Sequence, residues 1–327
     1  MGCIAKYRKR QLSVLTATIM AAVWMPTAMA ASASLPSGLH GGQGVHIDNE
    51  KTNDTHMEIV VDGIDGKAKG IANWTDFSIA KDHSVHFRSA LEEWMVLNRV
   101  TGDNASEIYG SLTGDGTIFL VNPHGITFYD GASVDVGSFL ASTLQISDDA
   151  FLNGGTAYSF SNNKDASGNK IANIDGKIKI EKGADITAED GYVALLAYDI
   201  NNAGTIKAPD VALAAGQQIE LAYDSKINLK VDVSKDNPAI IETGKNYVLM
   251  RGSDAKEIVN YSIINNTGII NAAGLVKNDA GEIVLTTAGD IALVAAQVAL
   301  ADDSKLSAAG GTITTSGYEN LKVAEGA

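Results

Sequence analysis

Short apolar runs that alternate with polar residues dominate the chain from about residue 35 onward. The stretch "KIKIEKGADITAEDGYVALLAYDINNAGTIKAPDVALAAGQQIELA" (177–222) is representative, and "GEIVLTTAGDIALVAAQVAL" (281–300) has the same texture. Apolar positions recur at every second residue, and the runs end at Gly, Asn or Asp. A period of two bounded by turn-forming residues predicts β-strands. Helical periodicity is nearly absent, and "FRSALEEWMVL" (87–97) carries at most one expected helical turn.

A second, longer regularity is superimposed on the strand pattern. The motif "NNAGTIKA" (201–208) recurs further along the chain as "NNTGIINA" (265–272). We interpret the displacement between the two copies as about three steps of twenty-odd residues each, the length of one solenoid coil. A β-solenoid buries inward-facing aliphatic residues against the coils above and below it. A β-sandwich also has many short strands, but it predicts no displaced self-similarity.

The segment 1–30 has the pattern of a secretory signal peptide. Four basic residues precede the apolar run "LSVLTATIMAAVWM" (12–25), and the small-residue motif "AMA" (28–30) follows it. This order predicts cleavage after Ala30. The apolar run is too short for a spanning helix, so we expect it to be removed.

Export and composition together limit the classes of partner. The only cysteine, Cys3, lies in the signal peptide, so no disulfide can stabilise the exported chain. The signal peptide holds four of the 25 basic residues and none of the 39 acidic ones, which leaves a formal charge of −18. A strongly acidic chain argues against nucleic acid or an anionic membrane as a partner.

Several motifs between residues 35 and 160 occur in a specific order. They are "NW" (73–74), "LNRVTG" (97–102), "IFLVNPHGITF" (118–128) and "FLAST" (139–143). This ordered set resembles the N-terminal secretion domain of filamentous-haemagglutinin-type exoproteins, and in particular the high-molecular-weight adhesin group of two-partner secretion. The resemblance is strong over 35–160 and extends more loosely to about residue 300.

The resemblance implies a fold and a route. Family members leave through the general secretory machinery and then cross the outer membrane of a Gram-negative bacterium through a dedicated pore. Periplasmic domains of that pore recognise the secretion domain in extended form. Outside the cell the domain folds as a right-handed parallel β-helix, with an N-terminal cap and small extra-helical β elements, and nucleates the helix that follows. We therefore expect residues 31–327 to form a single capped β-helix at the start of a longer exoprotein, secreted or held at the cell surface.

The resemblance also singles out two groups of residues for transporter recognition or folding. They are Asn98, Arg99 and Thr101 from the first motif, and Asn122, Pro123, His124, Gly125 and Ile126 from the second. The family motif is Asn-Pro-Asn-Gly-Ile, so His124 departs from it. Histidine, like asparagine, is enriched at positive φ, and we expect the turn to survive. A buried corner asparagine and a fixed turn would need the same residues without any receptor, so both roles stay open.

The main functional expectation is a non-enzymatic secretion domain of an adhesin that has host-cell surface ligands. The same domain on a cytolysin or a contact-dependent inhibition toxin is the alternative, followed by a β-helix carbohydrate-active enzyme. No catalytic motif supports the enzyme. His83 and His86 would lie on opposite faces of a strand, and the calcium-like stretches at 41–48 and 162–170 lack a required carboxylate, so we expect no metal and no cofactor.

Overall fold

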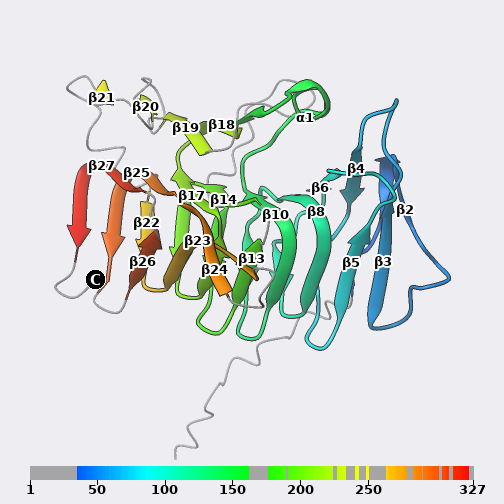
Figure 1. Cartoon of the computed structure of the whole chain (residues 1–327). Coiled ribbons are helices and arrows are strands. Elements are labelled where there is room, and N and C mark those ends of the chain that lie inside the picture. The colour runs from blue at the N-terminus through cyan, green and yellow to red at the C-terminus, as the bar shows by residue number, and fades with distance from the viewer. Residues whose placement is uncertain are drawn as a thin grey trace, which may run out of the picture. The chain divides into compact units, whose positions relative to one another are not determined.

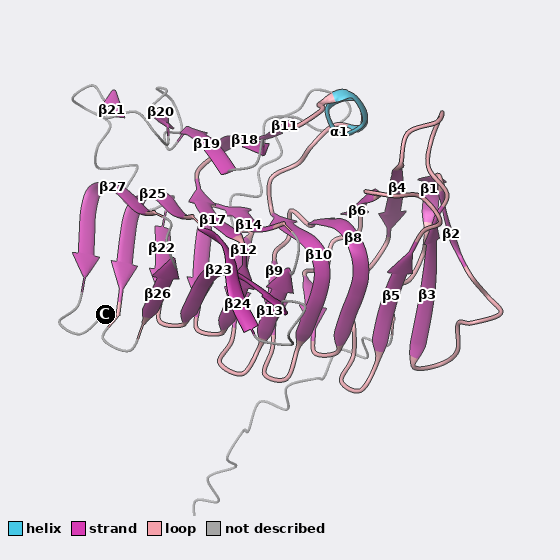
Figure 2. Ribbon diagram, viewed as in Figure 1, coloured by secondary structure: helices cyan, strands magenta, loops and turns pink. Residues whose placement is uncertain are grey.

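The computed structural model describes residues 35–161, 176–188, 191–223, 227–232, 240–242, 248–249, 263–277, 283–288, 290–301, 304–308 and 312–323. Figure 2 shows that nearly all regular structure in these ranges is β-strand. Parallel strands of successive coils pair side by side in Figure 1 and form the three faces of a β-helix, named here A, B and C in chain order. The predicted all-β parallel β-helix is confirmed. No helix among the described residues is long and apolar enough to cross a membrane.

Each face is a stack of strands. Face A contains β3 (His56–Val61), β5 (Ser84–Arg88), the first halves of β8 (Ser111–Val121) and β10 (Ser133–Ser142), β13 (Asp185–Ala188), β16 (Thr205–Ala208), the start of β23 (Ile269–Lys277) and β26 (Lys305–Ala308). Face B contains β4 (Lys69–Trp74), β6 (Met95–Val100), the second halves of β8 and β10, β14 (Tyr192–Ala197), β17 (Asp210–Ala215), and the first halves of β25 (Ile291–Leu300) and β27 (Ile313–Val323). Face C contains β7 (Ser106–Ile108), β9 (Ile126–Phe128), β12 (Lys177–Ile180), β15 (Asp199–Asn202), β22 (Ile263–Asn266) and the ends of β25 and β27.

The first coil is covered by antiparallel strands. Strand β1 (His40–Gln43) pairs with β4, and β2 (Val45–Ile47) pairs with β3, both antiparallel. These strands pair with the outer edge of the first coil, which would otherwise expose unpaired backbone N–H and C=O groups to another chain. They form the N-terminal cap that the family resemblance implies.

Face B differs from the other faces because it is buried on both sides. An outer antiparallel sheet packs against it, made of β11 (Ala157–Ser161), β18 (Gln218–Tyr223), β19 (Ile227–Asp232), β20 (Ile240–Glu242) and β21 (Val248–Leu249). In β14, Val193 and Leu195 face the helix interior, whereas Ala194 and Leu196 face the outer sheet. The run "YVALLA" has no polar alternation because a strand covered on both faces needs none.

The displaced "NN" repeat has a different origin from the one that we predicted. Asp199 pairs with Ile263 in register, so the two copies lie on adjacent coils, whereas Lys177 pairs with Asp199 after a much shorter stretch of chain. The segment between the two copies is therefore one coil that contains most of the outer sheet. The expectation of three coils was wrong, because an excursion lengthens the sequence between neighbours without adding a coil to the stack. Two other segments leave the coils: α1 (Asp148–Asn153) with β11, between β10 and β12, and a hairpin of β23 with β24 (Ile283–Ala288).

The helix expectations need one further correction. Within 87–97 the chain leaves β5, turns, and enters β6 without any helix. The one helix of the described residues is α1 (Asp148–Asn153), where the Ser147 side chain caps the Ala150 backbone N–H and Asp148 and Asp149 occupy the first turn. A serine cap followed by acidic residues is a helix-start signal that the strand-dominated pattern concealed.

Candidate functional site

The Asn-Pro-His-Gly segment is a β-turn at the corner between faces B and C. The Gly125 backbone N–H donates to the Asn122 carbonyl at 3.1 Å, which closes the turn. Gly125 has a φ of 112°, a positive value that favours glycine over residues with a side chain. His124 does not have a positive φ, so the expectation that histidine substitutes for asparagine by tolerating positive φ was wrong. The left-handed position falls on Gly125, and position 124 accepts either residue because its backbone is ordinary.

The Asn122 side chain holds this corner together. It is fully buried, and its amide nitrogen donates to the Asn104 carbonyl and to the Ser106 hydroxyl, each at 3.0 Å. Its amide oxygen accepts the His124 backbone N–H at 2.9 Å. One side chain therefore satisfies three groups on two successive coils.

The coil above closes over the turn. Residues Pro123, Gly125 and Ile126 are buried, and only His124 is partly exposed. A Cβ atom added at Gly125 would lie 3.2 Å from the Lys177 carbonyl oxygen in the next coil. In the folded domain the motif side chains, His124 apart, are therefore out of reach of a receptor.

The second predicted group lies on β6 and directly after it, one coil below the turn. Asn98 is fully buried; its side-chain oxygen accepts the Trp74 indole N–H at 3.0 Å, and its amide donates to the Phe119 carbonyl at 3.3 Å. The Thr101 hydroxyl donates to the Trp74 carbonyl at 3.0 Å. The "NW" and "LNRVTG" motifs are thus two halves of one inter-coil contact.

Arg99 has another role, on the outer side of face B. Its guanidinium donates to the Asn73 side chain at 3.0 Å, to the Ile146 carbonyl at 2.9 Å and to the Asp148 carboxylate at 2.7 Å. These bonds fasten the start of α1 to the β-helix. The attachment of the α1 segment to face B is sufficient to explain an arginine at this position.

The two motif groups meet at one corner. Val121 pairs with Arg99 in adjacent strands, and the loop that follows "LNRVTG" supplies the Asn104 carbonyl bound by Asn122. The sequence indicated both motifs but not this contact. Ser106 was missed altogether, because a single serine at a strand start carries no distinguishing signal.

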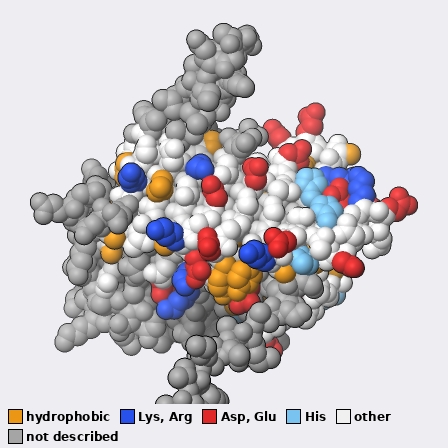
Figure 3. Space-filling model, turned by 90° about the horizontal axis from the view of Figure 1, so that it is seen from below, with side chains coloured by type: hydrophobic (Ala, Val, Ile, Leu, Met, Phe, Trp, Pro, Cys, Tyr) orange, Lys and Arg blue, Asp and Glu red, His pale blue; other side chains and the backbone are white. Residues whose placement is uncertain are grey.

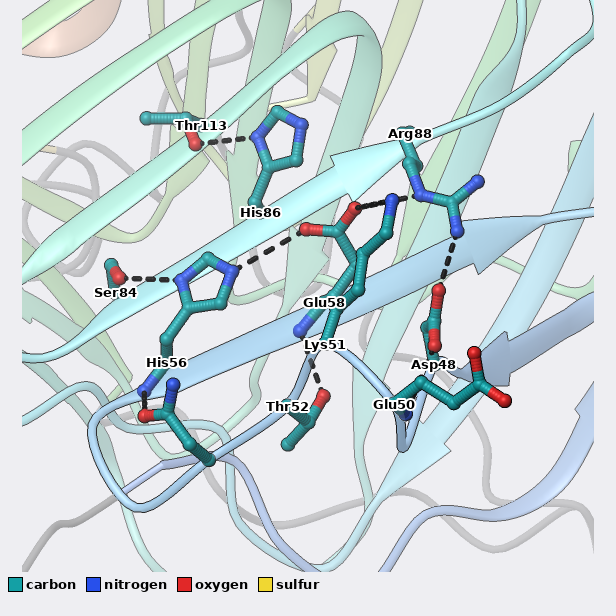
Figure 4. A network of polar contacts seen from close by, with 11 residues as sticks. Asp48, Glu50, Lys51, Thr52, His56, Glu58, Ser84, His86, Arg88 and Thr113 are labelled. Carbon is teal, nitrogen blue, oxygen red and sulfur yellow. Dashed lines mark hydrogen bonds and ion pairs between the residues drawn. The ribbon is translucent and has the colours of Figure 1, made fainter.

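A polar network on face A was also missed by sequence reasoning (Figure 4). The Arg88 guanidinium donates to the Asp48 carboxylate at 2.6 Å and to the Glu58 carboxylate at 2.7 Å. His56 Nε2 lies 3.4 Å from Glu58, and Lys51 Nζ lies 3.7 Å from it. Glu58 comes from β3 and Arg88 from β5, so the network joins the first two coils.

The network keeps Glu58 ionised although its side chain is almost entirely buried. Burial raises the pKa of the Glu58 carboxyl, but the hydrogen bond from Arg88, with the charges of His86 and Lys51, outweighs burial and leaves the pKa below its ordinary value. The Asp48 and Glu58 carboxylates share Arg88 as a cationic partner, so the arrangement stabilises the contact between the first two coils.

The structure also places the histidines considered as metal ligands. His83 precedes β5 and its Nδ1 lies 2.9 Å from the Lys81 carbonyl, whereas His86 Nδ1 lies 2.8 Å from the Thr113 hydroxyl. Figure 3 shows histidines gathered toward the N-terminal coils, among interspersed acidic and basic side chains. Within the ranges that the structure describes, no group of three or more His, Cys, Asp or Glu residues is arranged to hold a metal ion. The calcium-like stretch at 162–170 lies outside the described residues.

Comparisons with known proteins agree with this architecture. A heme/hemopexin-binding protein of Haemophilus influenzae strain Rd is 27% identical over 215 residues, which are 64% of this chain and 20% of that protein. Another H. influenzae heme/hemopexin-binding protein is 37% identical over 81 residues, 25% of this chain and 9% of that protein. The chain thus matches a fifth or less of the length of these relatives.

A solved structure and a family model complete the comparison. The crystal structure of the HMW1 secretion domain from H. influenzae superposes with a TM-score of 0.55 at 23% identity, over 85% of this chain and 66% of that one, and so shares its fold. The family model described as the TPS secretion domain matches residues 34–293. Since this match covers most of the sequence, the chain belongs to the TPS family, the secretion domains of two-partner secretion exoproteins.

Proposed function

We propose that the Asn122 turn and the "LNRVTG" segment are read by the periplasmic domains of the outer-membrane transporter while the chain is still extended. Membership of the family implies a cognate outer-membrane transporter and export across the outer membrane of a Gram-negative bacterium. The observation that carries the proposal is the burial of Asn98 and Asn122, which are both fully enclosed in the folded coil. A receptor that reads these side chains must meet them before folding.

The same corner then serves a second step outside the cell. Asn122 joins the loop after β6 to the turn before β9, so it helps to fix one coil on the next. A capped, well-fixed first set of coils offers a template on which later coils of an exoprotein add their strands. In this proposal, one set of residues supports recognition in the periplasm and nucleation of folding outside.

Secretion of the chain from a Gram-negative host, with and without the cognate transporter, tests the proposal. We expect folded chain in the medium only when the transporter is present, and accumulation in the periplasm when it is absent. Equal amounts in the medium under both conditions would contradict transporter dependence. Crosslinking of the periplasmic chain to the transporter, tested with Asn98 and Asn122 variants, would show whether these residues contribute to recognition.

We further propose that the complete exoprotein acts by binding, as an adhesin or a surface receptor, and not as an enzyme. The relatives named for binding heme and hemopexin support a binding cargo. The full-length exoprotein should retain host cells or the heme–hemopexin complex on a surface. Cell lysis or growth inhibition of neighbouring bacteria without such retention would instead favour a toxin.

A further inference from the structure

A cavity of about 500 Å³ lies where the bends of β8 and β10 and the start of β6 meet β14, β11 and β18. Trp94, Thr117, Ser138 and Tyr192 line it from the β-helix. Tyr158 and Tyr223 line it from the outer sheet. A concave site at the junction of two packed units, aromatic in its lining and with a few polar groups, is the usual form of a small-molecule site.

The walls of this pocket are fixed in advance. Lys69 Nζ donates to the Tyr158 hydroxyl at 3.3 Å, and that hydroxyl lies 2.9 Å from the Gly155 carbonyl, to which it can donate. The Trp94 indole N–H donates to the Asp115 carboxylate at 2.9 Å. Because these hydrogen bonds already hold the two side chains in place, little conformational freedom is lost when a ligand enters.

Tyr192 is the group that points to a ligand. Tyr192 is only 4% exposed, and its hydroxyl makes no hydrogen bond within the described part of the chain. Thr143 Oγ1 is the only fully enclosed side-chain polar atom there without a partner, so the Tyr192 hydroxyl must reach open space. That space is the pocket. A nearly buried hydroxyl without a partner is costly, and an acceptor on a ligand would remove the cost.

The remaining lining fits a ligand with several hydroxyl groups. Gly116 and Gly137 also line the pocket, and a Cβ atom added at Gly116 would lie 2.3 Å from the Trp94 ring, so this glycine lets the indole pack against the strand. Carboxylates of Glu93 and Asp115, both on exposed residues, stand at the rim as acceptors. Glu93 has a φ of 50°, a strained conformation for a residue with a side chain.

We propose that this pocket binds a neutral sugar residue, with the Tyr192 hydroxyl donating to a ring or hydroxyl oxygen and the rim carboxylates accepting sugar hydroxyls. A quaternary ammonium ligand would need open aromatic faces. Trp94 and Tyr192 are 2% and 4% exposed, so little of their rings is available for such a cation. This site goes beyond secretion and does not depend on the proposed reading of the corner motif.

Fluorine NMR of the 5-fluorotryptophan-labelled chain tests the proposal. The sequence holds three tryptophans, Trp24, Trp74 and Trp94, and only Trp94 lines the pocket. Titration with N-acetylglucosamine, and separately with galactose, should shift the Trp94 resonance and leave that of buried Trp74 in place. The Trp94 resonance is assigned as the one lost in Trp94→Phe.

Two variants and a second probe make the outcome decisive. Tyr192→Phe removes only the hydroxyl and should weaken sugar binding about tenfold, the effect of one lost hydrogen bond. The Tyr129 hydroxyl donates to Glu107 outside the pocket, so the control variant Tyr129→Phe should bind the sugar as the wild type does. The proposal is overturned if neither sugar shifts Trp94 at tens of millimolar, if Tyr192→Phe binds unchanged, or if choline shifts Trp94 and the sugars do not.

Discussion

Replacement of Asn122 by alanine, compared with the same change at Asn202, separates recognition by the transporter from stability of the fold. Asn202 is a matched control because it is also a buried asparagine at a corner, between β15 and β16. Its side-chain oxygen accepts the Gly204 backbone N–H at 3.1 Å, as that of Asn122 accepts the N–H two residues on. Asn202 lies outside both predicted motifs.

The expected magnitudes follow from the hydrogen bonds that each change removes. Asn122→Ala leaves three groups without their partner, those of Asn104, Ser106 and His124. At about 1 kcal/mol for each bond, the free energy of unfolding should fall by about 3 kcal/mol. Asn202→Ala leaves two groups without their partner: the Gly204 backbone N–H, and the Asn266 side-chain oxygen, which accepts from the Asn202 amide at 2.8 Å. This change should lower the free energy of unfolding by about 2 kcal/mol.

Two measurements on both variants give the answer. Urea unfolding of the purified chain yields the loss of stability, and the amount of chain in the medium, relative to the amount in the periplasm, yields secretion. If the transporter recognises the Asn122 turn, secretion of Asn122→Ala falls at least tenfold, whereas Asn202→Ala is secreted nearly as well as the wild type.

A different pattern would refute the reasoning. If both variants lose secretion in proportion to their loss of stability, the turn acts only through folding, and the proposed reading by the transporter is wrong. If Asn122→Ala loses less than about 1 kcal/mol, the three hydrogen bonds do not hold the corner as the structure indicates.

Three further predictions concern the turn, the face A network and the outer sheet. Gly125→Val places a β-branched residue at a φ of 112° beside Lys177 and should lower the free energy of unfolding by about 2 kcal/mol or more, measured in urea. The pKa of Glu58 is lowered in the folded state, so Glu58 contributes stability that is present above its ordinary pKa of 4.5 and is lost as the pH falls through the folded value. The Arg88→Gln variant should therefore be less stable than the wild type at neutral pH and should lose less stability on acidification. A pH profile of the urea midpoint that does not change in this variant would contradict the prediction. Burial raises the pKa of Tyr158 to about 12, so the stability contributed by its protonated hydroxyl is full below pH 10 and is lost as the pH rises toward 12. In an ultraviolet titration, the Tyr158→Phe variant should lack one tyrosine that ionises late. The same variant should unfold at a higher pH than the wild type.

Local sequence determined the class of fold and the form of the turn. A period of two with Gly, Asn and Asp at the ends of runs specifies strands because side chains alternate across a pleated strand. The positive φ of Gly125 was readable because few other residues adopt it. The ordered motifs of residues 73–143 were sufficient to indicate the family, which the match over residues 34–293 shows.

Tertiary structure decided which residues touch. Asn122 finds the Asn104 carbonyl only because the coil below turns at the same height, and Asn202 meets Asn266 although the two are far apart in the sequence. Contacts in a β-helix follow the stacking register, which depends on where each coil returns and not on sequence separation. An excursion such as the outer sheet changes the separation freely and leaves the register intact, so periodicity alone could not locate these partners. The pocket around Tyr192 has the same origin, since the sheet that closes it folds back onto face B from two separate excursions.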